Sequence, residues 1–209
     1  MIRVVLVSDH PAIRAGLAQV IDSEPGMRVE LAEPVSVASA PPGSDADVVL
    51  IDAPLARADA FGVCHELKQL ASPRRVAVYT DRAREDVALA AWVAGADALI
   101  EKTAPATVLF EQLRMVARGG RVLSSPSARA LTTAARELDA AERVVFGMCV
   151  YGVTLEGISR TLRRDPLEVE ATVRELIRRL GRPAPRAYPR LGRTPDRGCS
   201  PSREPARLR

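Results

Sequence analysis

Four residues that could carry chemistry follow short apolar runs in the first half of the chain. They are Asp9, Asp52, Thr80 and Lys102, after the runs at 2–7, 48–51, 76–79 and 98–100. Short apolar runs separated by segments of helical period are typical of parallel strands buried on both faces. In such sheets ligands bind outside the carboxyl ends of the strands. The four side chains are therefore predicted to meet at one edge of a sheet.

Two carboxylates, a hydroxyl and an ammonium can together bind a divalent cation and accept a phosphoryl group. Because Mg²⁺ prefers oxygen ligands and usually keeps several waters, Asp9 and Asp52 supply enough carboxylates. With a cation neutralising charge repulsion, an oxygen of Asp52 can attack a phosphoryl donor. We expect Lys102 to pair with Asp52, and Thr80 to hydrogen-bond the phosphoryl group. Each residue also has an alternative without a functional role. Asp52 could merely cap a loop, Lys102 could be a surface lysine, and Thr80 could be an ordinary β-branched strand residue.

The pattern around these residues predicts an α/β fold. Strands are expected at 2–7, 27–31, 48–51, 76–79 and 98–100, alternating with helices at 11–22, 61–70, 84–94 and 105–118. Such alternation predicts a doubly wound, five-stranded parallel sheet. The crossover at 33–47 contains three prolines, so its helix is expected to be short or lost. Further along, helices alone are expected, at 140–150, 155–162 and 166–180, with Thr154 and Asp165 as N-caps.

Composition and charge set the class of protein. The chain has 209 residues, 47% of them hydrophobic, which supports one large or two small globular domains. Three widely spaced cysteines and the lack of a long apolar run favour a cytoplasmic protein without a membrane span or signal peptide. Residues 182–209 hold eight arginines, two acidic residues and six prolines, which is typical of a disordered, polyanion-attracting tail. Its positive charge exceeds that of the whole chain, +4.

Several motifs in the right order resemble bacterial two-component response regulators of the NarL/FixJ family. The opening "IRVVLVSDHPAIRAGLAQVI", then "DVVLID", "VAVYT" and "GADALIEK", resemble the strands of a flavodoxin-like receiver. The resemblance implies a receiver domain at 1–121, a linker at 122–137, and a small all-α LuxR-type helix-turn-helix at 138–181. The tail at 182–209 follows. The implied partners are a sensor histidine kinase, double-stranded DNA and a second regulator, as a homodimer or heterodimer.

The resemblance also assigns roles in the receiver. Asp52 is the implied phosphoacceptor, Asp9, Asp52 and the Pro54 backbone carbonyl are implied Mg²⁺ ligands, and Thr80 and Lys102 are implied switch residues. One departure matters: this family usually places two acids after the first strand, and here they are Ser8 and Asp9. The missing acid predicts weakened cation binding.

The sequence at 138–181 aligns with the LuxR-type pattern without a gap. Its last predicted helix carries an apolar stripe expected to face the two preceding helices. The opposite face is implied to meet DNA, together with the turn before it, through Glu170, Thr172, Arg174, Arg178, Arg163 and Arg164. Glu170 stands where many relatives have a lysine, and an acid there repels phosphates.

Three hypotheses remain from the sequence. The first is a transcriptional response regulator, not an enzyme, controlled by phosphorylation of Asp52. The second is an atypical, phosphorylation-independent regulator or interaction module that dimerises through its receiver, which the serine at position 8 favours. The third is a phosphotransfer enzyme with an appended helical domain. It ranks last because the sequence offers no second general acid and no glycine-rich phosphate loop.

Overall fold

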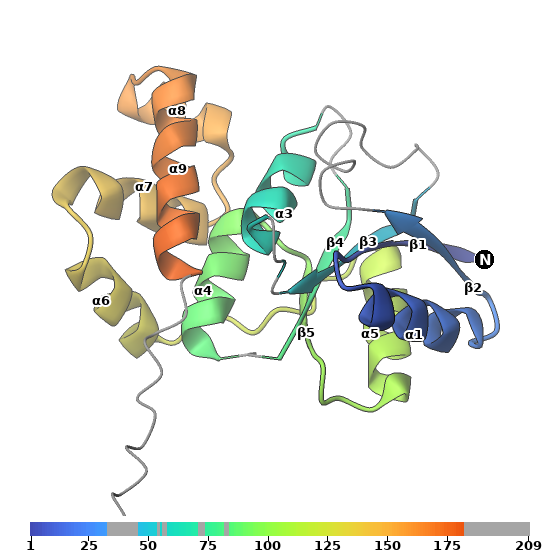
Figure 1. Cartoon of the computed structure of the whole chain (residues 1–209). Helices are drawn as coiled ribbons and strands as arrows, with labels where there is room; N and C mark the ends of the chain where they lie inside the picture. Colours follow the sequence, from blue (N-terminus) through green and yellow to red (C-terminus); the bar gives the residue numbers. More distant parts are fainter. Residues whose placement is uncertain (33–45, 54, 56–57, 71–73, 82–83, 182–209) are drawn as a thin grey trace, which may run out of the picture.

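The computed structural model of the chain describes residues 1–32, 46–53, 55, 58–70, 74–81 and 84–181, the side chain of Asp86 excepted (Figure 1). Three of the expectations lie outside these residues: most of the crossover at 33–47, the Pro54 carbonyl, and the disordered tail at 182–209. The described residues include the ends of all the strands on which the other expected site residues lie.

A five-stranded parallel sheet forms the first half of the molecule. Its strands are β1 (Ile2–Val7), β2 (Met27–Ala32), β3 (Val48–Ala53), β4 (Val76–Thr80) and β5 (Ala98–Glu101). They lie in the order β2-β1-β3-β4-β5, and every neighbouring pair is parallel. The predicted doubly wound sheet is confirmed. Four strands run one or two residues further than predicted, so Asp52 and Thr80 lie within the strand ends.

Helices cover both faces of the sheet because its strands are apolar on both sides (Figure 1). The helices of one face are α1 (Pro11–Asp22) and α5 (Ala106–Ala117), and those of the other are α3 (Ala60–Lys68) and α4 (Glu85–Ala94). Successive strand residues point to opposite faces. The side chains of β1 therefore alternate between the hydrophobic cluster under α1 and α5 and the one under α3 and α4.

The second half is all helical. Its helices are α6 (Ala128–Arg136), α7 (Ala140–Val150), α8 (Leu155–Leu162) and α9 (Pro166–Leu180). Each begins at a capping side chain that accepts a backbone N–H: Ser127, Asp139, Thr154 and Asp165 respectively. Asp139 and Glu142 form a reciprocal capping box. The last three helices have the predicted bounds, and α6 lies within the predicted linker.

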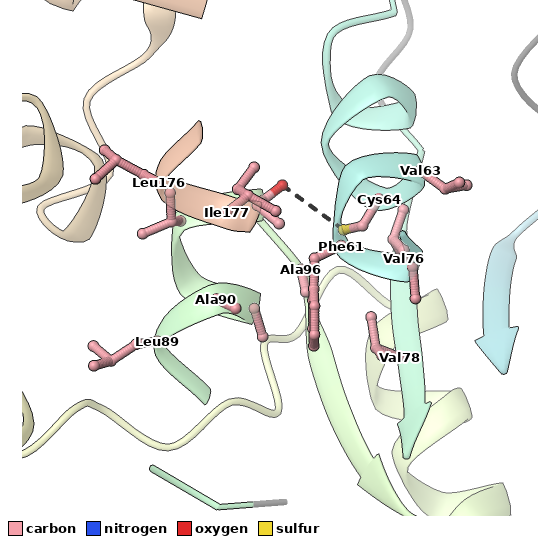
Figure 2. Close-up of a cluster of buried hydrophobic side chains, with 14 of the residues drawn as sticks. Phe61, Val63, Cys64, Val76, Val78, Leu89, Ala90, Ala96, Leu176 and Ile177 are labelled. Carbon is pink, nitrogen blue, oxygen red and sulfur yellow. Dashed lines mark hydrogen bonds between the residues drawn. The ribbon is translucent and has the colours of Figure 1, made fainter. Parts of the chain in front are cut away.

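One hydrophobic cluster runs from the sheet into the helical half without a break. It joins residues of β3, β4, α3 and α4 to the buried stripe of α9, which consists of Val169, Val173, Leu176 and Ile177. Figure 2 shows part of this cluster, with Leu176 and Ile177 on the same side of the sheet as Phe61 and Ala90. The α9 stripe contacts α7 and α8 as predicted, but its contact with α4 is larger than either.

Candidate functional site

The carboxyl edge of the sheet gathers the residues that the strand pattern singles out. Asp52 pairs in register with Tyr79, Ala53 with Thr80, and Thr80 with Glu101, so three neighbouring strands end at one level. Ser8, Asp9 and Lys102 follow directly after β1 and β5. Parallel strands bring these positions to one edge because all their carboxyl ends point the same way.

Asp52 is fully buried, and both of its carboxylate oxygens have partners. Oδ1 forms an ion pair with the Nζ of Lys102. Oδ2 accepts a hydrogen bond of 2.8 Å from the Oγ of Ser8, which is also fully buried. A buried carboxylate is tolerated only when it is paired and hydrogen-bonded. Ser8 therefore takes part in the site directly, whereas the sequence pattern marked it only as a missing acid.

Lys102 is held in place by β4 and by its own backbone. Its N–H donates to the carbonyl of Thr80 at 2.8 Å, and its carbonyl accepts from the Tyr79 hydroxyl at 3.4 Å. Its ammonium also lies 5.7 Å from the centre of the Tyr79 ring. Burial, and after it the charge of Asp52, raises the pKa of Tyr79, so the hydroxyl stays protonated as a donor. Tyr79 was not expected as a site residue, although its place beside Thr80 at the strand end was the available signal.

Asp9 and Thr80 lie at the same edge but have different surroundings. Asp9 forms a contact of 3.0 Å with Nδ1 of the exposed His10, and its side chain is 12% exposed. Thr80 is buried at the end of β4. The described residues therefore bring Asp52, Lys102 and Ser8 into direct contact and place Asp9 and Thr80 next to them in the chain and the sheet.

The donor set at this edge suits a hard cation in part. Asp9 and Asp52 are oxygen ligands of the kind that Mg²⁺ takes, and Mg²⁺ needs only one or two of them. Among the described residues no group of three or more acidic, histidine or cysteine side chains is gathered for a metal. Ser8 and Lys102 already engage both oxygens of Asp52, so a cation would have to share that carboxylate with them.

The residues expected to meet DNA lie mostly on α9, and they face acids. Arg174 contacts Glu170 at 2.8 Å within the helix and Glu66 of α3 at 3.4 Å. Arg178 pairs with Glu175 at 2.6 Å. The two arginines beside Glu175 lower its pKa to about 2, so these pairs are charged at neutral pH. Glu66 was not expected from the sequence, because helical periodicity does not reveal which distant helix an exposed side chain meets.

The turn between α8 and α9 holds the other two expected DNA contacts. Arg163 is exposed and ends α8 in the left-handed conformation, with φ of 53°. Arg164 lies 3.5 Å from Glu168 in the first turn of α9. Thr172 donates its hydroxyl proton to the carbonyl of Glu168 at 2.8 Å, on the helix itself. Together these residues form a helix-turn-helix whose second helix is electrically balanced, with three arginines against three glutamates.

The strand order and the acidic carboxyl edge define a flavodoxin-like receiver, followed by a helix-turn-helix. Residues 4–114 match the family described as the response regulator receiver domain, and the chain belongs to this family. The DNA-binding transcriptional activator DevR/DosR of Mycobacterium tuberculosis is 26% identical, over 87% of this chain and 89% of its own. The nitrate/nitrite response regulator NarP of Escherichia coli (strain K12) is 25% identical, over 85% and 88%.

Solved structures of response regulators have a similar fold. The response regulator ChrA of a heme-sensing two-component system is 27% identical, with a TM-score of 0.51 over 88% of this chain and 92% of that one. RcsB of Salmonella enterica serovar Typhimurium, bound to the promoter rprA with a phosphomimetic, has a TM-score of 0.53 over 88% and 94% of the two chains. At 18% identity the latter shows the fold alone. No helix among the described residues is long and apolar enough to span a membrane.

Proposed function

We propose that this protein is a DNA-binding transcriptional response regulator of a two-component system, controlled by phosphorylation of Asp52. The observation that carries the proposal is the buried Asp52–Lys102 pair at the carboxyl edge of a receiver whose core continues into a helix-turn-helix. Relatives that cover nearly all of the chain are named as DNA-binding or nitrate-responsive regulators. The proposed modules are the receiver at 1–121, the linker at 122–137 and the DNA-binding domain at 138–181.

Asp52 acts as the nucleophile in this proposal. One of its oxygens forms a bond to phosphorus while the bond between phosphorus and a histidine nitrogen of a sensor kinase breaks, and that nitrogen takes up a proton. Lys102 moves from the free carboxylate to a phosphoryl oxygen, and Thr80 donates a hydrogen bond to another. Mg²⁺ supplies charge neutralisation when bound, and Asp9, Asp52 and the Pro54 carbonyl would hold it.

Control of DNA binding follows from the position of α9. Its Arg174 faces Glu66 of the receiver, and its apolar stripe is shared with α4. Reading a major groove through Glu170, Thr172, Arg174 and Arg178 therefore requires α9 to leave the receiver. In the proposal, phosphorylation at Asp52 favours that separation, and Arg163 and Arg164 then contact DNA phosphates.

The same proposal names the partners and the compartment. A sensor histidine kinase supplies the phosphoryl group, and double-stranded DNA is the target of the released module. A homodimer, or a heterodimer with a related regulator, would join two half-sites and raise affinity. The cytoplasm is the compartment in which these partners meet. The receiver promotes only its own phosphorylation, so the protein would not act as an enzyme on a separate substrate.

Intact mass spectrometry after treatment with acetyl phosphate, with and without Mg²⁺, tests the chemistry. We expect one phosphoryl mass gain that depends on Mg²⁺ and disappears in Asp52→Asn. Duplex binding, measured by fluorescence anisotropy, should tighten in the treated wild-type protein and stay unchanged in the variant. Label that survives in Asp52→Asn refutes the assignment. Sequence-specific DNA binding without any mass gain would instead support the phosphorylation-independent alternative.

A further inference from the structure

A crevice with a volume of about 270 Å³ lies where the receiver meets the helical half. At ~30 Å³ for each water in the liquid, it has room for roughly nine water molecules, or a ligand with about as many heavy atoms. One wall is formed by His65, Lys68, Trp92 and Arg121 of the receiver side, and the other by mostly apolar residues from the end of α7, the start of α8 and the middle of α9. Neither half forms the crevice alone.

Two polar groups in the crevice lack a matching partner. His65 is 3% exposed, and its Nε2 has no hydrogen-bond partner among the described residues. A buried polar atom without a partner costs free energy. Burial, and after it the charge of Arg174, lowers the pKa of His65, while Glu170 opposes this. The ring is therefore neutral at pH 7.

Arg121 is the second such group. Its guanidinium stacks 3.5 Å from the centre of the Trp92 ring and makes no ion pair with any residue that the structure describes. Arg121 is exposed at the mouth of the crevice. Partial desolvation lowers its pKa, and the charge of Asp97, which also lines the crevice, offsets this only in part. Lys68, the other cation of the crevice, is already paired with Asp97 at 2.6 Å. The charged side chains of the crevice therefore leave one uncompensated positive charge.

We propose that this crevice binds a small organic anion, whose carboxylate pairs with Arg121 and whose apolar body lies against Cys149, Val153 and Val173. Bidentate pairing with a carboxylate is the geometry that a guanidinium favours. Small-molecule pockets combine apolar walls with a few fixed polar groups, and this crevice offers both. The chain's own tail at 182–209 is a poor occupant, because eight arginines would add to the uncompensated charge.

Benzoate is a suitable probe, and benzamide, which is neutral and has the same shape, is its control. Trp92 is the only tryptophan of the chain, so its fluorescence reports on the crevice directly. The two histidines give two ring signals by NMR. His65 lies in the crevice and His10 is exposed at the carboxyl edge, so His10 serves as an internal reference. Benzoate should change the Trp92 and His65 signals saturably and leave His10 unchanged, with benzamide at least about tenfold weaker.

Two arginine variants separate this site from general attraction between charges. Arg121→Gln should weaken benzoate binding about tenfold and leave benzamide binding unchanged. Arg129→Gln removes the same charge from an exposed position on α6 and should have no effect. The proposal is overturned if benzoate gives no saturable change at 50 mM, if benzamide binds equally well, or if Arg121→Gln binds benzoate like the wild type. It is also overturned if benzoate binds to a chain that lacks residues 182–209 but not to the full chain, because the tail would then occupy the crevice.

A bound anion would touch both halves and thus favour the arrangement in which α9 stays on the receiver. This coupling between the crevice and DNA binding rests on the proposed function. It predicts that saturating benzoate weakens DNA binding and that DNA weakens benzoate binding by the same factor. Ligand binding is measured without DNA, so it can succeed while the coupling fails. Benzoate binding without any effect on DNA would contradict only this coupling.

Discussion

Replacing Ser8 with alanine measures how strongly the serine supports the buried Asp52. Their hydrogen bond is 2.8 Å long, and both residues are fully buried. A hydrogen bond to a charged group contributes about 1.5–3 kcal/mol, whereas one between neutral groups contributes about 0.5–1.5 kcal/mol. We therefore expect Ser8→Ala to lower the free energy of unfolding by about 2 kcal/mol in the wild type. In an Asp52→Asn background the same change should cost only about 1 kcal/mol.

The difference between these two costs, about 1 kcal/mol, is the coupling energy of a double-mutant cycle. The backbone N–H of His10 also donates to Ser8 Oγ at 3.2 Å, and the loss of that bond cancels because it occurs in both arms. Urea unfolding followed by Trp92 fluorescence and by far-UV circular dichroism gives the four free energies, and coincident transitions establish two-state behaviour. Additivity within about 0.3 kcal/mol would refute the reasoning. So would a cost below about 0.5 kcal/mol for Ser8→Ala alone.

Four other outcomes are expected. Ser8→Asp should tighten Mg²⁺ binding in a calorimetric titration, because it adds a carboxylate beside Asp52, and equal or weaker affinity would contradict this. Deletion of residues 182–209 should weaken binding to specific and scrambled duplexes alike. It should also flatten the plot of log binding constant against log salt concentration, by about 0.9 in slope for each phosphate that the tail neutralises in the full chain. Arg174→Ala should weaken the binding free energy for DNA by about 1–3 kcal/mol, on the preferred site only. Glu66 is the receiver residue that pairs with Arg174, and Glu66→Gln should not weaken binding to that site. Burial raises the pKa of Cys64 to about 12, so its thiol should resist iodoacetamide at pH 8 in the folded protein and react after unfolding in urea.

Most of the fold could be predicted because local patterns determine it. Apolar runs fix the five strands, and capping residues such as Thr154 and Asp165 fix where the last helices begin. The apolar stripe of α9 was also evident from helical period. Its partner was not, because a stripe that fits α7 and α8 fits the alanine-rich face of α4 as well.

The candidate site was predictable in place but not in detail. Parallel strand ends determine that Asp52 and Lys102 lie at one edge, and the structure places them in contact. The sequence pattern could mark Ser8 only as the lack of an acid, because a serine hydroxyl gives no signal until its acceptor is in reach. The unpaired Nε2 of His65 could not be foreseen either, since it depends on what surrounds α3 in three dimensions.

Alanines on α4 have a consequence for the genetics of this regulator. Ala90, Ala91 and Ala94 are almost completely buried in the cluster that includes the α9 stripe. Small side chains let two helices approach closely, and a larger residue there forces them apart at a cost of about 1–3 kcal/mol. A selection for variants that alter transcription without a signal should therefore yield substitutions at these alanines of α4. These positions are neither Asp52 nor the residues proposed to contact DNA, so their phenotypes would otherwise have no evident cause.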